Sequence, residues 1–230
     1  MAEKGYTEFQ GVDKVWIAEV TEDSDDNYTC GTPEHLIPAG ELSTTSNTDK
    51  ATKYYDNIPF LVVASEGSTD LTLTCPVLPL KMQSKITGKY FDETTGALMD
   101  SGQPIVKYFA LMYRERFLDG TYRYVVRHKT SISLNDQSNK SLDDSTDSNG
   151  MELAISSITT QHVFTKTGTV SKAMIVDERD GKADVSKWYT AVETPDTLKP
   201  KSPSSNFSSS FNTLGSNKFN TSSTTPYNNS

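Results

Sequence analysis

The chain has 230 residues, with 22 Lys and Arg against 30 Asp and Glu, which gives a formal net charge of −8. Its length fits one domain with or without an appendage, and an aromatic content of 10% is too high for a wholly disordered chain. The acidic balance argues against nonspecific nucleic-acid binding, which depends on clustered Lys and Arg. No apolar run approaches the roughly 18 residues of a membrane-spanning helix.

The N-terminal segment predicts β-structure in a reducing compartment. Residues 12–20 (VDKVWIAEV) are rich in β-branched and aromatic residues and predict a strand. The start of the chain lacks the apolar segment of a secretory signal, and Cys30 and Cys75 form neither a CxxC motif nor a disulfide framework. We therefore expect two reduced thiols and folding in the cytoplasm.

One acidic turn has the spacing of calcium ligands. Tyr28 stands where a calcium loop needs glycine, so an acidic turn between strands is the better interpretation. The residues at positions 1, 3, 5 and 12 of that pattern are Asp23, Asp25, Asn27 and Glu34.

A polar segment and an apolar run follow each other in the next part of the chain. Residues 43–57 (STTSNTDKATKYYDN) predict a long loop, which is usually functional or disordered when it exceeds about 12–15 residues. Residues 58–64 (IPFLVVA) predict a strand buried on both faces, and residues 71–74 alternate as in a strand. The loop is therefore interpreted either as an arm that orders against a partner or as a mobile surface loop.

Residues 77–86 predict one short amphipathic helix. Leu78, Met82 and Ile86 are four apart, and Gly88 suits the C-terminal cap. Pro76 suits the first helical position.

The segment 104–131 predicts a β-hairpin around Asp119 and Gly120. Asp-Gly favours a two-residue type I′ turn, which would place Phe117 opposite Tyr122. The face expected to lie in the core then consists of Leu111, Tyr113, Phe117, Tyr122, Tyr124 and Val126.

The same register would gather four of the five arginines on the other face: Arg114, Arg116, Arg123 and Arg127. Like charges opposed in a ladder are destabilising unless carboxylates lie between them. Because the chain is acidic, we hypothesise that another copy supplies those carboxylates in a homo-oligomer interface. A solvated face and a nucleic-acid contact are the alternatives.

The remaining chain predicts two strands, a polar loop and a tail. Strands are expected within 151–164 and 169–176, and a weaker helix within 186–194, whereas 133–150 predicts a second polar loop. Ser, Thr and Asn fill 21 of the 35 positions in residues 196–230, so we expect a domain over 1–195 and a flexible tail over 196–230. The tail carries one Asp and three Lys, which leaves a net charge of −10 on residues 1–195.

No catalytic or cofactor motif emerges. His35, His128 and His162 are far apart in the sequence, and no Walker A, GxGxxG or GxSxG motif is present. His128 is expected to be a satisfied core histidine near Leu111. We therefore expect neither an enzyme nor a bound metal or cofactor.

The order of these features resembles the major tail protein, or tail tube, family of long-tailed, non-contractile bacteriophages of Gram-positive bacteria. The resemblance covers roughly residues 5–195 and depends on order and spacing. Its segments are GYTEFQGVDKVWIAEV, IPFLVVASEG, LTLTCPVLPLKMQSKITG, GKYFDETTGALMDSG, QPIVKYFALMYRERFLDGTYRYVVRHKTSI and MELAISSITTQHVF. Some members carry an immunoglobulin-like decoration domain after the core, where this chain has its polar tail.

The resemblance implies a mainly β (α+β) fold, an antiparallel β-sandwich or barrel with one flanking helix and long inter-strand loops. It also implies a structural virion protein whose hexameric rings stack into a tube around the tape-measure protein. Tail terminator and baseplate proteins would be further partners, with assembly in the host cytoplasm and no membrane contact. DNA would pass through the channel, where an acidic lumen would repel phosphate. The alternative is a phage decoration or adhesion protein that binds the host surface.

In such proteins a long loop after the early strands reaches an adjacent ring, and residues 43–57 are the matching segment. The candidate inter-ring residues are Thr44, Asn47, Asp49, Lys50, Tyr54 and Tyr55. The candidate residues of the second loop are Asp136, Asp143, Asp144 and Asp147.

Overall fold

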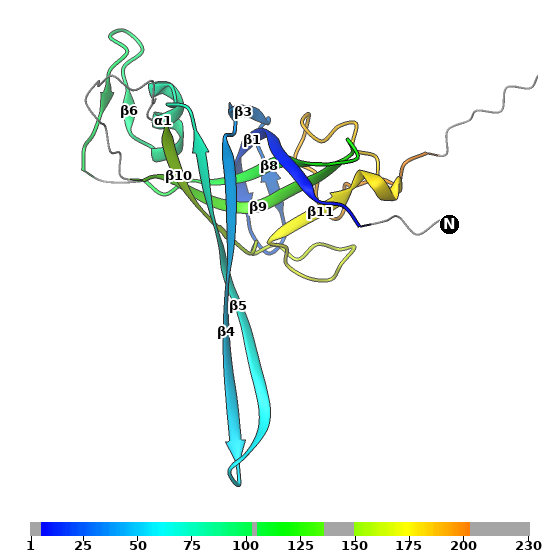
Figure 1. Cartoon of the computed structure of the whole chain (residues 1–230). Helices are drawn as coiled ribbons and strands as arrows, with labels where there is room; N and C mark the ends of the chain where they lie inside the picture. The colour runs from blue at the N-terminus through cyan, green and yellow to red at the C-terminus, as the bar shows by residue number, and fades with distance from the viewer. Residues whose placement is uncertain (1–5, 103–104, 136–149, 203–230) are drawn as a thin grey trace, which may run out of the picture.

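The computed structural model describes residues 6–102, 105–135 and 150–202, and these form a body from which one long hairpin projects (Figure 1). Within these ranges nine antiparallel strands make one sheet in the order β2-β1-β8-β9-β10-β5-β4, with β3 paired to β1 and β11 paired to β9. The strands of this sheet are β1 (Phe9–Asp23), β2 (Tyr28–Cys30), β3 (Glu34–Ile37), β4 (Glu41–Tyr55), β5 (Ile58–Cys75), β8 (Tyr108–Phe117), β9 (Tyr122–Leu134), β10 (Met151–Ile158) and β11 (Ala173–Asp177). A separate two-stranded sheet joins β6 (Tyr90–Phe91) to β7 (Leu98–Met99). The structure confirms a mainly β fold, with one α-helix among the described residues, consistent with a β-sandwich.

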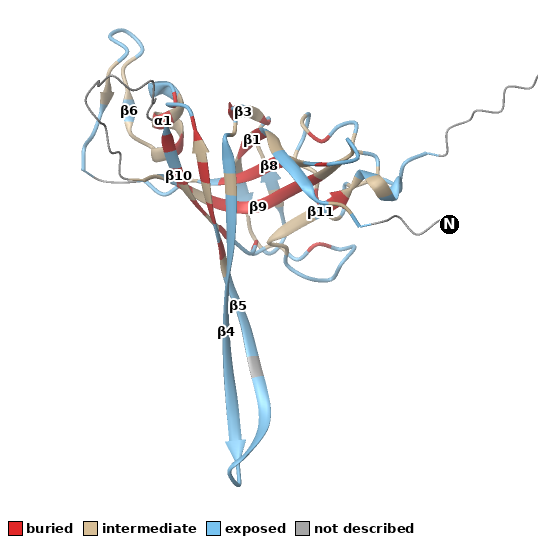
Figure 2. Cartoon of the chain, viewed as in Figure 1, coloured by how far each residue is buried: buried red, intermediate tan, exposed pale blue. Residues whose placement is uncertain are grey.

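Buried apolar residues form two separate clusters in the body, and Figure 2 shows the buried positions in red along its strands. Successive strand residues point to opposite faces, so neighbours in β8 contribute to different cores. Leu111 and Tyr113 belong to a large core with α1 and β3, whereas Met112 belongs to a smaller core closed by Trp188. The C-terminal segment thus supplies the cover for the second face.

Helix α1 (Leu80–Thr87) starts three residues later than predicted. A residue that precedes proline is disfavoured in the helical conformation, so Leu78 cannot be helical and Pro79 becomes the N-cap. Gly88 is the C-cap, as predicted, with φ of 70°. The helix predicted within 186–194 is wrong, because 186–190 form turns and 191–194 are irregular. No helix in the described part of the chain has the length and apolarity to span a membrane.

The predicted register of the β8–β9 hairpin is wrong by one residue. Leu118, Asp119 and Gly120 form a three-residue loop, in which Phe117 N–H donates to the Thr121 carbonyl at 2.9 Å and Gly120 has φ of 83°. A type I turn followed by a left-handed glycine is the usual form of such a loop. Glu115 therefore lies opposite Arg123, and a one-residue shift exchanges the faces of one strand relative to the other.

Strand predictions elsewhere hold except for the segment before Ile58. Strands β1, β5, β10 and β11 lie where the sequence predicts strands. The loop predicted over 43–57 is wrong, because β4 takes up most of it and pairs with β5. The strand predicted over 58–64 exists, but Ile58, Phe60, Leu61 and Val62 are exposed in the single chain instead of buried.

The described body continues past the predicted boundary at residue 195. Asp196 accepts backbone hydrogen bonds from Thr165 and Lys166 at 3.0 and 2.7 Å, and Leu198 packs against the second core. Lys201 N–H donates to the Lys182 carbonyl at 2.7 Å. The tail that the sequence predicts lies outside the described residues from position 203 onward.

Candidate assembly surface

The β4–β5 hairpin leaves the body because its third strand ends. Within the body β5 is paired on both sides, with β10 from Cys75 to Thr69 and with β4. Strand β10 ends at Ile158, so beyond Thr69 the hairpin continues as two strands alone. Every residue of β4 from Ser43 to Tyr55 is exposed, and Figure 2 shows this arm in pale blue. An isolated two-stranded hairpin is only marginally stable in water, so an arm of this kind favours a partner.

A β-bulge marks the point at which the arm leaves the body. Gly67 and Ser68 in β5 together oppose Asn47 in β4, and bulges of this type bend and twist a strand pair. Asn47 Nδ2 donates to a carboxylate oxygen of Asp70 at 2.7 Å, and Ser156 Oγ donates to the other at 2.8 Å. These hydrogen bonds hold the pKa of Asp70 below its usual value. The bulge is therefore tied to β10 of the body.

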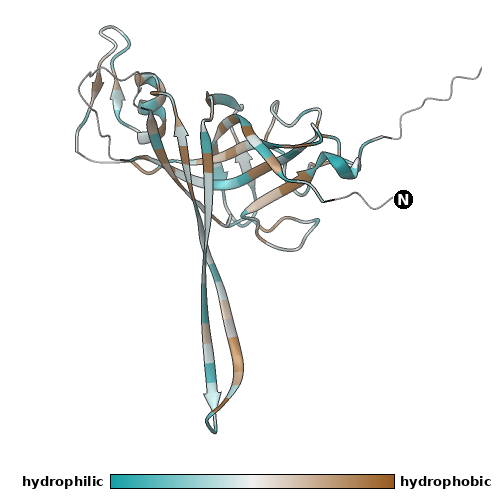
Figure 3. Ribbon diagram, viewed as in Figure 1, coloured by the Kyte–Doolittle hydropathy of each residue, from teal (hydrophilic) through white to brown (hydrophobic). Residues whose placement is uncertain are grey.

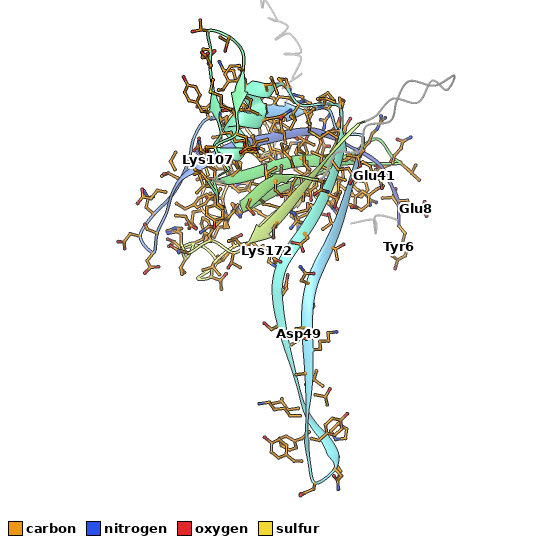
Figure 4. The ribbon with its side chains drawn as sticks, turned by 90° about the vertical axis from the view of Figure 1, so that its left-hand side faces the viewer. Tyr6, Glu8, Glu41, Asp49, Lys107 and Lys172 are labelled. Carbon is orange, nitrogen blue, oxygen red and sulfur yellow. The ribbon has the colours of Figure 1, made fainter. Side chains whose placement is uncertain are left out.

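Lys172, labelled in Figure 4, also binds the bulge. Its Nζ donates to Glu66 Oε1 at 2.8 Å and to the Gly67 carbonyl at 2.7 Å. The Lys172 side chain is only 13% exposed, although Glu66 is open to solvent. We call Asp70 and Lys172, with their partners, the root clasp, and it fixes the direction in which the hairpin projects.

The end of the hairpin is apolar on both faces. Leu61 lies opposite Lys53 and Val62 lies opposite Thr52, so the two consecutive apolar side chains point to opposite faces. The rings of Tyr55 and Phe60 contact each other edge to face, with centroids 5.3 Å apart. Figure 3 shows this apolar stretch of β5 in brown near the end of the arm. We call the exposed residues here the tip patch: Tyr54, Tyr55, Ile58, Phe60, Leu61 and Val62.

The predicted inter-ring residues are spread along this arm. Thr44 lies where β4 is still part of the body sheet, Asn47 lies at the bulge, and Asp49 and Lys50 lie on the middle of the arm. Tyr54 and Tyr55 lie at the tip. Sequence reasoning missed the other four residues of the tip patch, although the apolar run from Ile58 to Ala64 was the signal for them.

The four arginines do not share one face. In the observed register Arg114 and Arg116 lie on one face of the hairpin, and Arg123 and Arg127 lie on the other. The structure therefore removes the premise on which their interface role was predicted, and that role stays an untested prediction.

Carboxylates of the same chain pair with two of these arginines. Arg114 binds both carboxylate oxygens of Asp13, at 2.5 and 2.8 Å, and its guanidinium lies 3.8 Å from the ring centre of Tyr122. Arg123 contacts Asp177 at 2.9 Å. For these two, no second copy is needed to supply the opposite charge. The second-loop residues Asp136, Asp143, Asp144 and Asp147 lie outside the described residues.

The titratable groups of the body serve its structure. His128 is fully buried, its Nδ1 and Nε2 lie 3.0 Å from Ser171 Oγ and 3.3 Å from the Glu193 carbonyl, and burial lowers its pKa to about 4. Asp23, from the calcium-like pattern, instead binds Lys129 at 2.6 Å in a pair that is nearly closed to solvent. Both cysteines are free, and burial raises the pKa of the Cys30 thiol to about 11. Among the described residues, no three His, Cys, Asp or Glu side chains are placed to share a metal ion.

A groove of about 830 Å³ lies beside the hairpin root. Ser46 and Thr69 form one wall, and the segment from Lys166 to Ile175 forms another. Its exposed apolar side chains are Val170 and Ile175, and Lys172 of the root clasp also lines it. The groove therefore adjoins the arm at the end opposite the tip patch.

No family model matches this chain, and no curated protein matches its sequence. A solved structure that is similar is the cryo-EM structure of the cap that terminates the tube of the anti-feeding prophage. It is 11% identical, the match covers 76% of this chain and 97% of that chain, and the TM-score is 0.41. At this identity and TM-score, the likeness is not a basis for assigning a function.

Proposed function

We propose that this chain is a structural, non-catalytic subunit of a bacteriophage tail tube, and that its β4–β5 hairpin joins one copy to another. The observation that carries this proposal is the tip patch at the end of an arm that extends beyond the body as two strands alone. Apolar patches exposed in this way mark interaction sites, and aromatic side chains are enriched in such contacts. The sequence resemblance to the major tail protein family is a second, independent support.

The open edge of the sheet supports self-assembly. Among the described strands, β4 is the last in the sheet order, so its outer edge presents backbone N–H and C=O groups that pair with no other described strand. Pairing of edges in a closed ring removes this liability, and ring closure is a usual outcome of contacts between identical chains. The proposed assembly is a stack of rings, with six copies in each ring as the resemblance implies.

Charge supports passage of DNA without retention. Residues 1–195 carry a net charge of −10, so a channel formed by this domain has few cations with which to hold phosphate. We propose that DNA crosses the tube during ejection, with the tape-measure protein inside the tube before that step. Tail terminator and baseplate proteins would contact the two ends of the assembled tail.

A pair of matched variants tests the proposal. Phe60→Ser with Leu61→Ser removes apolar side chains of the tip patch that are 76% and 49% exposed, so the fold of the single chain is expected to survive. In sedimentation velocity we expect large assemblies for the unmodified chain and no species larger than a single ring for this variant. The control, Thr52→Ser, changes a polar residue of the same arm and should assemble normally. A tip variant that assembles like the unmodified chain would contradict the proposal.

The competing role, decoration or adhesion, predicts a different outcome in the same experiment. The unmodified chain would stay monomeric at high concentration and would bind the host cell wall, and the tip variant would lose that binding.

A further inference from the structure

The molecule exposes a second apolar patch at the end of the body remote from the hairpin tip. Helix α1, β6 and β7 form a small lobe there (Figure 1). Tyr90 and Met99 are cross-strand partners and are 66% and 52% exposed. Ile105 lies against Gly88, where an added Cβ atom would come within 2.8 Å of its side chain, and both Ile105 and Val106 are exposed. We call Tyr90, Met99, Ile105 and Val106 the lobe patch.

The two patches cannot meet within one chain. The arm is fixed to the body by the root clasp, and it projects away from the lobe in both views of the molecule (Figures 1 and 4). Beyond Thr48 the arm continues for seven residues of β4, roughly 23 Å at 3.3 Å per residue. Any partner for the tip patch must therefore come from another molecule.

We infer that the tip patch of one copy seats on the lobe patch of the next copy, in a head-to-tail contact that stacks copies along the direction of the arm. A contact between two different surfaces of identical chains repeats without limit unless the rotation closes it. When two copies in the same orientation are stacked along the arm, the tip of one first meets the end of the other that lies farthest from its own tip. That end carries the lobe patch.

Charge does not oppose this contact, although the chain as a whole is acidic. Residues 48–63 contain two Lys and two Asp, and residues 76–107 contain four Lys and three Asp or Glu. The excess of negative charge therefore lies elsewhere, and repulsion between these two segments does not oppose the contact. Between two rings, several such contacts form together, so the rings bind each other tightly even if each single contact is weak.

The inference deepens the proposed function and rests on it, because it names the receiving surface of the proposed arm. The groove beside the hairpin root is the competing receptor, since it also exposes Val170 and Ile175. The groove adjoins the root of the arm. For two copies in the same orientation, a tip could reach it only if the arm of one copy ran alongside the body of the other. The two receptors therefore predict different pairs of neighbouring residues.

Disulfide trapping between different copies tests the inference. Tyr55→Cys and Met99→Cys are made in separate chains that also carry Cys30→Ser, and the native Cys75 stays buried. Under oxidation, a mixture of the two chains is expected to give a covalent dimer that contains one of each, whereas either chain alone gives none. One chain with both substitutions is expected to give a ladder of multimers that reducing agent collapses to monomer.

The outcomes separate this inference from the proposed function. Normal tubes in electron micrographs with no Tyr55→Cys to Met99→Cys dimer would overturn the head-to-tail contact and leave the tail-tube role standing. A dimer between Tyr55→Cys and Val170→Cys would assign the tip to the groove and would also overturn it. A dimer of Tyr55→Cys with itself would indicate tip-to-tip pairing, with the same consequence. Absence of any assembly by the unmodified chain would overturn the proposed function and this contact together.

Discussion

His128 is a neutral ring in the core, and this makes the fold sensitive to acid. Its Nε2 lies by the Glu193 carbonyl, an acceptor only, so Nε2 carries the proton and Nδ1 accepts from Ser171 Oγ. The sequence predicted the burial of His128 from its position in an apolar strand. It could not predict these partners, because both come from segments more than 40 residues away.

The first prediction concerns the pH dependence that follows. Burial lowers the pKa of His128 to about 4, whereas an unfolded histidine titrates near 6.5. Between pH 6.5 and 4, His128 is therefore protonated in the unfolded chain and neutral in the folded chain. The free energy of unfolding falls over this range by up to about 3 kcal/mol. Urea unfolding at pH 7.5 and pH 5 measures the slope. His128→Gln should flatten it, whereas His35→Gln, at an exposed position, should not; an unchanged slope in His128→Gln would refute the assignment.

The second prediction concerns the pair of Asp23 and Lys129. Their side chains are only 6% and 11% exposed, and Asp23 also accepts backbone hydrogen bonds from Gln161 and His162. Asp23→Ala leaves a buried ammonium unpaired, so we expect a loss of about 3 kcal/mol in the free energy of unfolding. Adding Lys129→Met should recover part of this loss, since the unpaired charge is then gone.

The matched control for that pair is the exposed pair of Lys81 and Glu93, whose side chains are both 71% exposed. Glu93→Ala should leave the unfolding midpoint nearly unchanged, because water screens exposed pairs. Equal losses from Asp23→Ala and Glu93→Ala would show that burial does not set the strength of these ion pairs.

At the scale of elements, the sequence predicted strands where the body buries them and failed where the arm leaves it. Residues 43–57 lack apolar alternation because no face of β4 beyond Ser43 is buried, so they predicted a loop. The apolar run that follows was interpreted as a buried strand, since both faces are apolar. The structure shows that the two segments form one hairpin, whose pairing depends on β10 at its base. The prediction that four arginines share one face of the β8–β9 hairpin was wrong for a different reason. The loop has one more residue than predicted, which changes the register.

The third prediction concerns the root clasp. Lys172→Ala removes the contacts that Lys172 makes with Glu66 and Gly67, so the arm should move more freely while the body stays folded. Hydrogen exchange should quicken in 43–55 and 58–68, and assembly should slow because the arm is no longer held in place. Lys50→Ala removes an exposed lysine from the same arm and serves as the control for the exchange measurement. Unchanged exchange in Lys172→Ala would mean that the bulge alone fixes the arm.

At the scale of the whole molecule, the net charge of the protein distinguishes a channel through which DNA passes from a protein that binds DNA. The fourth prediction is that the unmodified chain does not retard double-stranded DNA in a gel at about 150 mM salt, because its net charge of −8 gives no broad basic surface. Retardation that weakens steeply with added salt would show that the chain holds phosphate, and would contradict passage without retention.

The central claim is that identical copies assemble into a tube through the hairpin. Electron microscopy of the purified, unmodified chain at high concentration tests it most directly. We predict hollow tubes or stacked rings with a central channel, with the hairpin density crossing from one ring to the next. Particles that remain monomers with a projecting hairpin at every concentration would contradict the claim.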